Sequence, residues 1–220
     1  MIEFNIITIF PKIFDSYINE SILKLARKKK LIKINTCDLR DFTSDKHNTV
    51  DDRPYGGGPG MILKVEPFYK ALQKLKSKNK KIKTRIIMLA PGGKTFDQKM
   101  AAQLAKYKNL IFLCGRYEGF DARIEKYVDE KISIGNYVLS GGELAAMVIT
   151  EAVARNIPGV LGHSEALKEE TFSPALDYVE YPQYTRPDKF KNQKVPAILL
   201  SGNHAVIKKW REKMAKNGQK

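Results

Sequence analysis

Apolar positions over residues 1–155 alternate between short continuous runs and helical spacing. Short apolar runs bounded by glycine, proline or polar residues are typical of buried strands, and apolar residues three and four apart are typical of one helix face. The runs predict strands at 2–10, 31–39, 85–90, 110–114 and 131–134. The helical spacing predicts helices at 18–30, 67–76, 97–106, 124–128 and 142–155. Strands that alternate with helices indicate an α/β domain with a mainly parallel sheet.

Individual residues refine these helices. Asp97 is the expected N-cap of its helix, and Pro67 is expected to begin another, because its fixed φ suits a first turn. The apolar side of the first helix is predicted to hold Ile18, Ile22, Leu25 and Ala26. The apolar positions of the 142–155 helix are Leu144, Met147, Val148 and Val153.

The pattern changes after Pro158. Residues 159–176 are polar and irregular, and residues 206–214 predict a basic helix. We therefore expect a domain over 1–159, a flexible linker over 160–176 and a small helical domain over 177–220.

Length and composition limit the classes of protein. The chain has 220 residues, of which 43% are hydrophobic, so it can bury a full core. Its apolar runs are too short to cross a bilayer, and its start lacks a secretory signal pattern, so no membrane partner is expected. The only cysteines are Cys37 and Cys114, which excludes a disulfide framework and a zinc cluster and favours a reducing, cytoplasmic location.

The charge balance favours a polyanionic partner. Lys and Arg number 39 against 24 Asp and Glu, a net charge of +15, and each neutralised phosphate releases counterions. Residues 70–85 hold eight basic residues and no acidic one, and residues 186–220 hold ten basic residues with aromatic side chains among them. A solvated helix face in a lysine-rich chain remains the alternative for the 70–85 segment.

The stretch MLAPGGKTFDQ at 88–98 contains GGKT. A phosphate-binding P-loop requires glycine five residues before Gly93, and Met88 occupies that position. A nucleotide hydrolase is therefore a weak alternative.

Three glycine-bearing segments follow predicted strands: 90–93, 114–119 and 133–143. In open α/β sheets, ligands bind at the carboxyl ends of the strands, and glycine lets the backbone approach a ligand closely. These segments predict a pocket for a flat or extended small molecule. The G-x-G-x-x-G dinucleotide fingerprint is absent, so a Rossmann cofactor site is not supported.

The segment 44–61, SDKHNTVDDRPYGGGPGM, has no periodicity. Its GGGPG has the G-x-G-x-G spacing of Rossmann-type methyltransferases, but no buried strand precedes it. Long loops inside compact domains are usually functional or disordered. Function is favoured here, because Asp51, Asp52, Arg53 and Tyr55 offer charge and stacking that a spacer would not need.

Other catalytic chemistry has little support. His47, His163 and His204 are scattered without metal-ligand spacing, and no serine nucleophile motif is present. The remaining polar candidates are Glu118, Arg155, Glu169, Glu170 and Asp177.

Several of these segments carry a family resemblance. DDRPYGGGPGM, CGRYEGFDARI, SIGNYVLSGGE, RNIPGVLG, and YTRP with LLSGNHA resemble, in the same order, bacterial tRNA (guanine-N1)-methyltransferases, the TrmD family of the SPOUT superfamily. The resemblance implies an α/β SPOUT fold with a deep trefoil knot in a mainly parallel sheet. It also implies S-adenosylmethionine-dependent methylation of the guanine just 3′ of the anticodon, tRNA position 37. The implied enzyme is a homodimer with active sites built from both subunits and requires Mg²⁺, for which the sequence indicates no metal site.

The resemblance also implies roles for individual residues. The residues expected around the methyl donor are Leu89, Ala90, Pro91, Gly93, Gly115, Tyr117, Glu118, Ile134, Gly135, Asn136, Tyr137, Val138, Leu139, Gly141 and Gly142. The residues expected to contact tRNA or hold the flipped guanine are Asp51, Arg53, Gly58, Gly60, Ser201, Asn203, His204 and Lys208. Asn136 stands where the family usually has aspartate, and family members usually continue beyond the position of Lys220.

Three residues are expected to carry catalysis by the same resemblance. Arg155 matches the catalytic arginine of the family, and Asp177 is expected to help position the target guanine. The general base of the family is the aspartate of a Glu-Asp-Ser-Phe type motif, which reads Glu169-Glu170-Thr171-Phe172 here, so Glu170 takes its place. An RNA-binding protein that has lost catalysis remains an alternative, as does a knotted methyltransferase acting on ribosomal RNA or a ribose hydroxyl.

Overall fold

The structure is a computed structural model that describes residues 1–77, 82–162, 170–172 and 179–217. The chain divides into two compact units, Met1–Gly162 and His163–Lys220. Most of the 160–176 segment lies outside the described residues, so the flexible linker stays a prediction. Within the described residues, no helix combines the length and apolar character needed to cross a bilayer.

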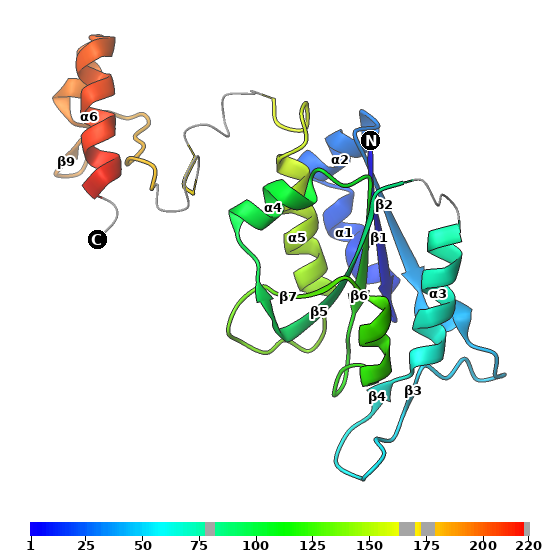
Figure 1. Ribbon diagram of the computed structural model, residues 1–220. Coiled ribbons are helices and arrows are strands. Elements are labelled where there is room, and N and C mark those ends of the chain that lie inside the picture. The colour runs from blue at the N-terminus through cyan, green and yellow to red at the C-terminus, as the bar shows by residue number, and fades with distance from the viewer. Residues whose placement is uncertain (78–81, 163–169, 173–178, 218–220) are drawn as a thin grey trace. The chain divides into compact units, whose positions relative to one another are not determined.

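The first unit is built on one parallel sheet of five strands in the order β2-β1-β6-β5-β7 (Figure 1). The strands are β1 (Ile2–Thr8), β2 (Ile32–Asp38), β5 (Thr84–Thr95), β6 (Asn109–Cys114) and β7 (Glu130–Ser133). The prediction of a mainly parallel α/β sheet is confirmed.

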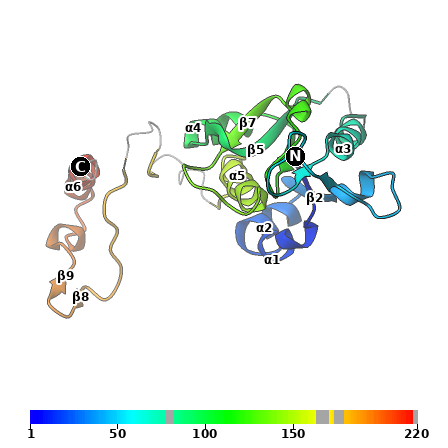
Figure 2. The ribbon, with the colours of Figure 1, turned by 90° about the horizontal axis from the view of Figure 1, so that it is seen from below.

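Helices cover both faces of this sheet (Figures 1 and 2). One face packs against α1 (Asp15–Ile18), α2 (Ser21–Lys28), α4 (Gln98–Leu104) and α5 (Glu143–Arg155). The other face packs against α3 (Val65–Ser77) and the 3₁₀ helices η2 (Leu39–Phe42) and η3 (Ala122–Tyr127). Successive side chains of a strand point to opposite faces, so Phe4 and Ile6 of β1 join one core cluster and Ile7 joins the other.

Polar side chains also link the strands across the sheet. Asn35 Nδ2 donates to Asn5 Oδ1 at 2.9 Å, and Asn5 Nδ2 donates to Asn109 Oδ1 at 2.7 Å. Asn109 Nδ2 then donates to Thr84 Oγ1 at 3.3 Å, so this asparagine ladder spans β2, β1, β6 and β5. Asn5 and Asn109 are buried. Because a buried amide without a partner is costly, the ladder opposes any slip of strand register.

Two helix predictions need correction. The expected 18–30 helix breaks after Ile18 into α1 and α2, and Ser21 at the start of α2 has a φ of 49°. The break turns α2, so Leu23 is buried whereas Leu25 is 54% exposed. The helix predicted from Pro67 begins two residues earlier, at Val65, and Pro67 lies in its first turn.

The buried face of α5 also differs from the prediction. Leu144 and Val148 are 55% and 48% exposed. The residues of α5 that face the sheet are Ala145, Ala146, Ile149, Thr150, Val153 and Ala154. Alanine side chains let α5 approach the sheet closely, and Leu144 and Val148 are left on its outer side, whereas Val153 is buried as predicted.

A short antiparallel pair closes the long loop. Strands β3 (Asp51–Asp52) and β4 (Ile62–Leu63) pair Asp51 with Leu63 and Asp52 with Ile62. Residues 53–61 therefore form a loop whose two ends are held together.

The second unit is small. Its described elements are the hairpin of β8 (Lys189–Phe190) and β9 (Gln193–Lys194), the 3₁₀ helix η5 (Ala197–Leu200) and α6 (His204–Asn217). The predicted basic helix at 206–214 is confirmed as part of α6. Arg211 lies over the Tyr181 ring at 4.9 Å, and the Tyr184 and Trp210 rings are 6.4 Å apart.

The asparagine ladder can be tested by Asn5→Ala. This substitution leaves the amides of Asn35 and Asn109 short of a buried partner, so the free energy of unfolding should fall by about 1–3 kcal/mol. Asn19→Ala is the matched control, because Asn19 is also hydrogen-bonded but exposed. Urea denaturation followed by circular dichroism measures both variants, and equal losses would contradict a register role for the ladder.

Candidate active site

A cavity of about 420 Å³ lies at the carboxyl ends of β5, β6 and β7. The three glycine-bearing segments line it, as the position of ligand sites in open α/β sheets leads one to expect. Its lining includes Leu89, Ala90, Pro91, Gly115, Tyr117, Glu118, Ile134, Gly135, Tyr137, Val138, Leu139, Gly141 and Gly142. Of the residues expected around a methyl donor, only Gly93 and Asn136 are absent from this lining.

The first segment reaches the cavity through a bulge in β5. Leu89 and Lys94 both pair with Ile132 of β7, so residues 90–93 loop out of the sheet between them. A Cβ on Gly93 would lie 2.6 Å from the backbone of Ile132. Gly93 is therefore required for close approach of two strands, which explains why it does not line the cavity.

The second and third segments are in direct contact. Gly142 N donates to Gly115 O at 3.0 Å, and a Cβ on Gly142 would lie 2.9 Å from Cys114 Cα. A Cβ on Gly141 would overlap the side chains of Arg116 and Glu143. The paired glycines 141 and 142 thus let the start of α5 lie against the end of β6.

Glu143 fixes this contact with a buried carboxylate. The residue is 1% exposed, Thr8 Oγ1 donates to its Oε1 at 2.7 Å, and Arg116 Nε donates to its Oε2 at 3.0 Å. It also lies in the first turn of α5, where the helix dipole favours a negative charge. Arg116 lines the cavity and stacks over the Phe10 ring at 4.7 Å. The sequence analysis missed both residues, although an acid directly after a glycine pair at a helix start is a recognisable signal.

Acidic groups line the mouth of the cavity. Glu118, Asp121 and Glu125 are among its lining residues. Arg123 is hydrogen-bonded to the Asp121 carboxylate and lowers the pKa of that carboxyl below its ordinary value. Burial raises the pKa of the Cys114 thiol well above its ordinary value, so this thiol stays protonated. These carboxylates share the lining with the cations Arg116 and Lys131, and Glu125 is paired with Lys131 at 2.9 Å.

The long loop is attached to the second segment. Leu63 N donates to Gly119 O at 2.9 Å, and Asp121 N donates to Leu63 O at 2.9 Å. A Cβ on Gly60 would lie 2.6 Å from Glu118 Cγ, so the loop packs directly on a residue of the cavity.

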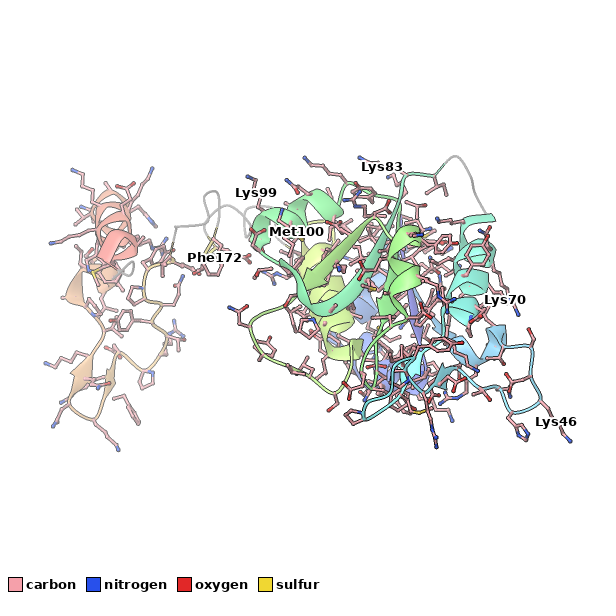
Figure 3. The ribbon with its side chains drawn as sticks, turned by 60° about the horizontal axis from the view of Figure 1, so that its bottom comes forward. Lys46, Lys70, Lys83, Lys99, Met100 and Phe172 are labelled. Carbon is pink, nitrogen blue, oxygen red and sulfur yellow. The ribbon has the colours of Figure 1, made fainter. Side chains whose placement is uncertain are left out.

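A second cavity of about 790 Å³ lies under this loop. It shares Phe120, Asp121 and Ala122 with the first cavity. Its basic lining residues are Arg53, Lys64, Lys70 and Arg123. The expected tRNA residue Arg53 lines this cavity, Asp51 belongs to β3, and Gly58 and Gly60 belong to the loop. Figure 3 shows Lys46 at the tip of the preceding loop and Lys70 on α3.

Arg155 lies away from the first cavity. It is the last residue of α5, whereas the cavity adjoins the first turn of the same helix. A 13-residue helix is about 18–20 Å long. The first unit of a single chain therefore does not bring Arg155 to its own cavity.

The remaining expected residues belong to the second unit. Glu170 is partly exposed, and Glu169 and Asp177 lie outside the described residues. Asn203 Oδ1 accepts from Val206 N at 3.2 Å, and Ser201 Oγ accepts from Asn203 N at 3.2 Å, so both side chains stabilise the start of α6. His204 is the first residue of α6, and Lys208 is exposed on it.

The chain is an α/β protein with a cavity lined by glycine-bearing loops at one edge of a parallel sheet. A family model described as tRNA (Guanine-1)-methyltransferase TrmD matches residues 2–220. The chain belongs to this family.

Individual relatives agree. A protein of Dictyoglomus turgidum named tRNA (guanine-N(1)-)-methyltransferase is 51% identical over 98% of this chain and 85% of its own length. Relatives with the same name from Carboxydothermus hydrogenoformans and a Sulfurihydrogenibium species are 50% and 53% identical. They match over 97% and 94% of this chain and over 82% and 80% of their own lengths.

The role of Glu143 can be tested by Glu143→Gln. Loss of the charge leaves Arg116 with a weaker partner, so the free energy of unfolding should fall by about 1.5–3 kcal/mol. Glu125→Gln is the matched control, because Glu125 lines the same cavity and pairs with Lys131 at 2.9 Å but is exposed. An exposed pair contributes about 0–1 kcal/mol. Denaturant titrations compare the two variants. If the free energy of unfolding falls no further for Glu143→Gln than for Glu125→Gln, the stabilising role of the buried Glu143 carboxylate is contradicted.

Proposed function

We propose that this chain, an enzyme of the tRNA (guanine-N1)-methyltransferase family, transfers a methyl group from S-adenosylmethionine to N1 of the guanine immediately 3′ of the anticodon, tRNA position 37. The observation that carries the proposal is the cavity that the three family-resembling segments line together. The family match over residues 2–220 supports the same substrate class. The close contact of the three segments and the parallel sheet also support a SPOUT knot, which we include in the proposal.

The cavity suits the methyl donor. Its volume of about 420 Å³ is within the range of small-molecule sites, about 300–1,000 Å³. Glycine backbone and apolar side chains such as Leu89, Ile134 and Leu139 offer hydrogen bonds and a flat contact for a nucleoside. Glu118 offers negative charge to the ammonium and sulfonium groups, whereas Asp121 and Glu125 are paired with Arg123 and Lys131. When bound, S-adenosylmethionine supplies an electrophilic methyl group.

Two side chains are assigned to the guanine. N1 must lose its proton, and negative charge then spreads to O6. In the proposal the Glu170 carboxylate accepts the N1 proton, and the Arg155 guanidinium stabilises the charge at O6. Asp177 helps to position the base. Glutamate keeps the carboxylate of the family motif on a side chain that is one methylene longer.

Two copies of the chain are needed to complete this site. The outward row of α5 consists of Leu144, Val148, Glu151 and Arg155, at spacings of four, three and four. Such a row lies on one helix face. Two copies packed antiparallel along these rows would bring Arg155 of one copy to the first turn of the other copy's α5, beside its donor cavity. We therefore propose a homodimer with shared active sites, which also covers the exposed Leu144 and Val148.

The long loop and the second unit are assigned to tRNA. A guanine in the anticodon loop must leave its stack before reaction, and aromatic and backbone contacts compensate for the lost stacking. Tyr55 is fully exposed on the loop that packs against Glu118, where it can stack on a base. The tRNA-contacting residues assigned to this loop region are Asp51, Arg53, Gly58 and Gly60. Those assigned to the second unit lie at or near the start of α6: Ser201, Asn203, His204 and Lys208.

No site for Mg²⁺ can be assigned from the described residues. In the part of the chain that the structure describes, no group of three or more His, Cys, Asp or Glu residues is arranged to hold a metal ion. The proposal therefore assigns no residue to Mg²⁺.

The activity can be tested with two unmodified tRNA transcripts that differ only in guanine or adenine 3′ of the anticodon. Labelled methyl incorporation should occur with guanine and be lower by more than about a thousandfold with adenine, because N1 and O6 of guanine are both required. Incorporation into neither transcript, with tRNA still bound, would contradict the proposal and favour an RNA-binding protein without catalysis. Equal incorporation into both would contradict the assigned position.

The same assay tests the base. Glu170→Gln should lower kcat by about a hundredfold or more, as expected for loss of a general base. Glu180→Gln is the matched control from the same unit, because the Glu180 carboxylate accepts from Gln183 Nε2 at 2.6 Å and has no assigned role in the reaction. Full turnover by Glu170→Gln would remove Glu170 from the role of base.

A further inference from the structure

A basic groove of about 500 Å³ lies between α2 and β2, away from both cavities described above. Its lining residues are Lys24, Arg27, Lys28, Ile32, Lys33, Ile34 and Asn35. β2 is an edge strand of the sheet, so this α2–β2 groove runs along one border of the first unit. Residues 21–34 hold six basic residues and no acidic one.

The charge of the groove is only partly compensated. Lys24 pairs with Glu20 at 3.8 Å and Lys33 pairs with Glu3 at 3.6 Å, and both pairs are exposed. Exposed pairs are weak and yield readily to another anion. Arg27 instead donates to neutral acceptors, Ile18 O at 3.0 Å and Asn19 Oδ1 at 2.6 Å. Six basic residues against two carboxylates leave a clear positive excess along this border.

The groove adjoins the end of α5 that carries Arg155. Lys29 Nζ donates to Gly159 O at 3.5 Å, and a Cβ on Gly159 would lie 3.4 Å from Leu31 Cδ1. The turn after α2 therefore rests on the turn that follows Arg155. In the proposed function the target base reaches Arg155, so the RNA strand that carries it would pass close to this basic border.

We propose that the α2–β2 groove binds the phosphate backbone of the substrate tRNA, outside the reacting nucleotide. This inference rests on the proposed function. The groove offers flexible lysine ammonium groups and contains no aromatic ring among its lining residues. Ammonium groups bind phosphates as point charges, whereas base recognition needs stacking or bidentate donors. The groove therefore contributes affinity that is independent of sequence and sensitive to salt.

The test replaces three groove lysines together, Lys24→Gln, Lys28→Gln and Lys33→Gln. Arg27 is kept, because it stabilises the end of α1. The matched control is Lys99→Gln, Lys106→Gln and Lys108→Gln, three exposed lysines that lie outside every site assigned above and cause the same change in net charge. Figure 3 shows Lys99 at the surface of α4. Thermal denaturation checks that both triple variants are folded.

Equilibrium binding of an unmodified tRNA transcript is measured over a series of salt concentrations. The groove variant should bind about tenfold or more weakly, and the slope of log affinity against log salt should become shallower by about two to three units, one for each lost phosphate contact. The control should keep a slope close to that of the wild-type chain. An unchanged slope for the groove variant, or equal changes in both variants, would overturn the proposal.

Methylation of the same transcript by the wild-type chain separates the two claims. Binding with the expected slope change but without methylation would sink the proposed function and leave the groove as an RNA-binding surface. Methylation by the wild-type chain together with unaltered tRNA binding by the groove variant would support the proposed function and overturn the proposal for the groove. In the expected case the groove variant has a raised KM for tRNA, whereas its KM for S-adenosylmethionine is unchanged.

Discussion

The buried carboxylate of Glu143 is the constraint on which the shape of the first cavity depends. A charge that is 1% exposed must be paired, and its partners come from two separate places, Thr8 at the end of β1 and Arg116 after β6. Because Arg116 must reach Glu143, the second glycine-bearing segment lies against the third. Because the two side chains fill the space beside residue 141, that residue has to be glycine. The cavity is what remains between segments held in this way.

Much of this arrangement could be predicted from the sequence. Short apolar runs bounded by glycine, proline or polar residues predicted the five strands. The rule that ligands bind at the carboxyl ends of strands in open α/β sheets predicted that the three glycine-bearing segments meet at one edge. Asp97 caps α4 as predicted, with its carboxylate accepting from Met100 N at 2.7 Å. The errors came from tertiary packing. Nothing local shows that α2 turns so that Leu25 faces outward, or that α5 buries its alanines instead of Leu144 and Val148. The Glu143–Arg116 pair joins residues from different segments, so its geometry could be known only from the fold. The roles of Arg155, Glu170 and Asp177 came from resemblance alone.

The outer face of α5 connects the structure of one chain to the proposed chemistry. Its first turn adjoins the first cavity and its last residue is Arg155, so in the proposed reaction one helix carries two parts that cannot meet within one copy. The exposed Leu144 and Val148 between these ends give apolar surface for a second copy. An antiparallel pair of α5 helices would cover Leu144 and Val148 and would also bring Arg155 to the cavity of the other copy. The α2–β2 groove would remain open beside the Arg155 end for the RNA backbone. In the proposed dimer, the outer face of α5 would therefore serve both assembly and substrate binding.

The most direct measurement is methyl transfer by mixed dimers of two inactive variants. One is Arg155→Ala, and the other is Leu139→Arg, which places a charged side chain in the donor cavity. If the two parts come from different copies, each heterodimer contains one intact site, and random mixing should restore about a quarter of wild-type activity. If both parts act within one copy, every site in the mixture is defective. Activity no higher than that of the separate variants, with heterodimers confirmed by tagged co-purification, would contradict the shared active site.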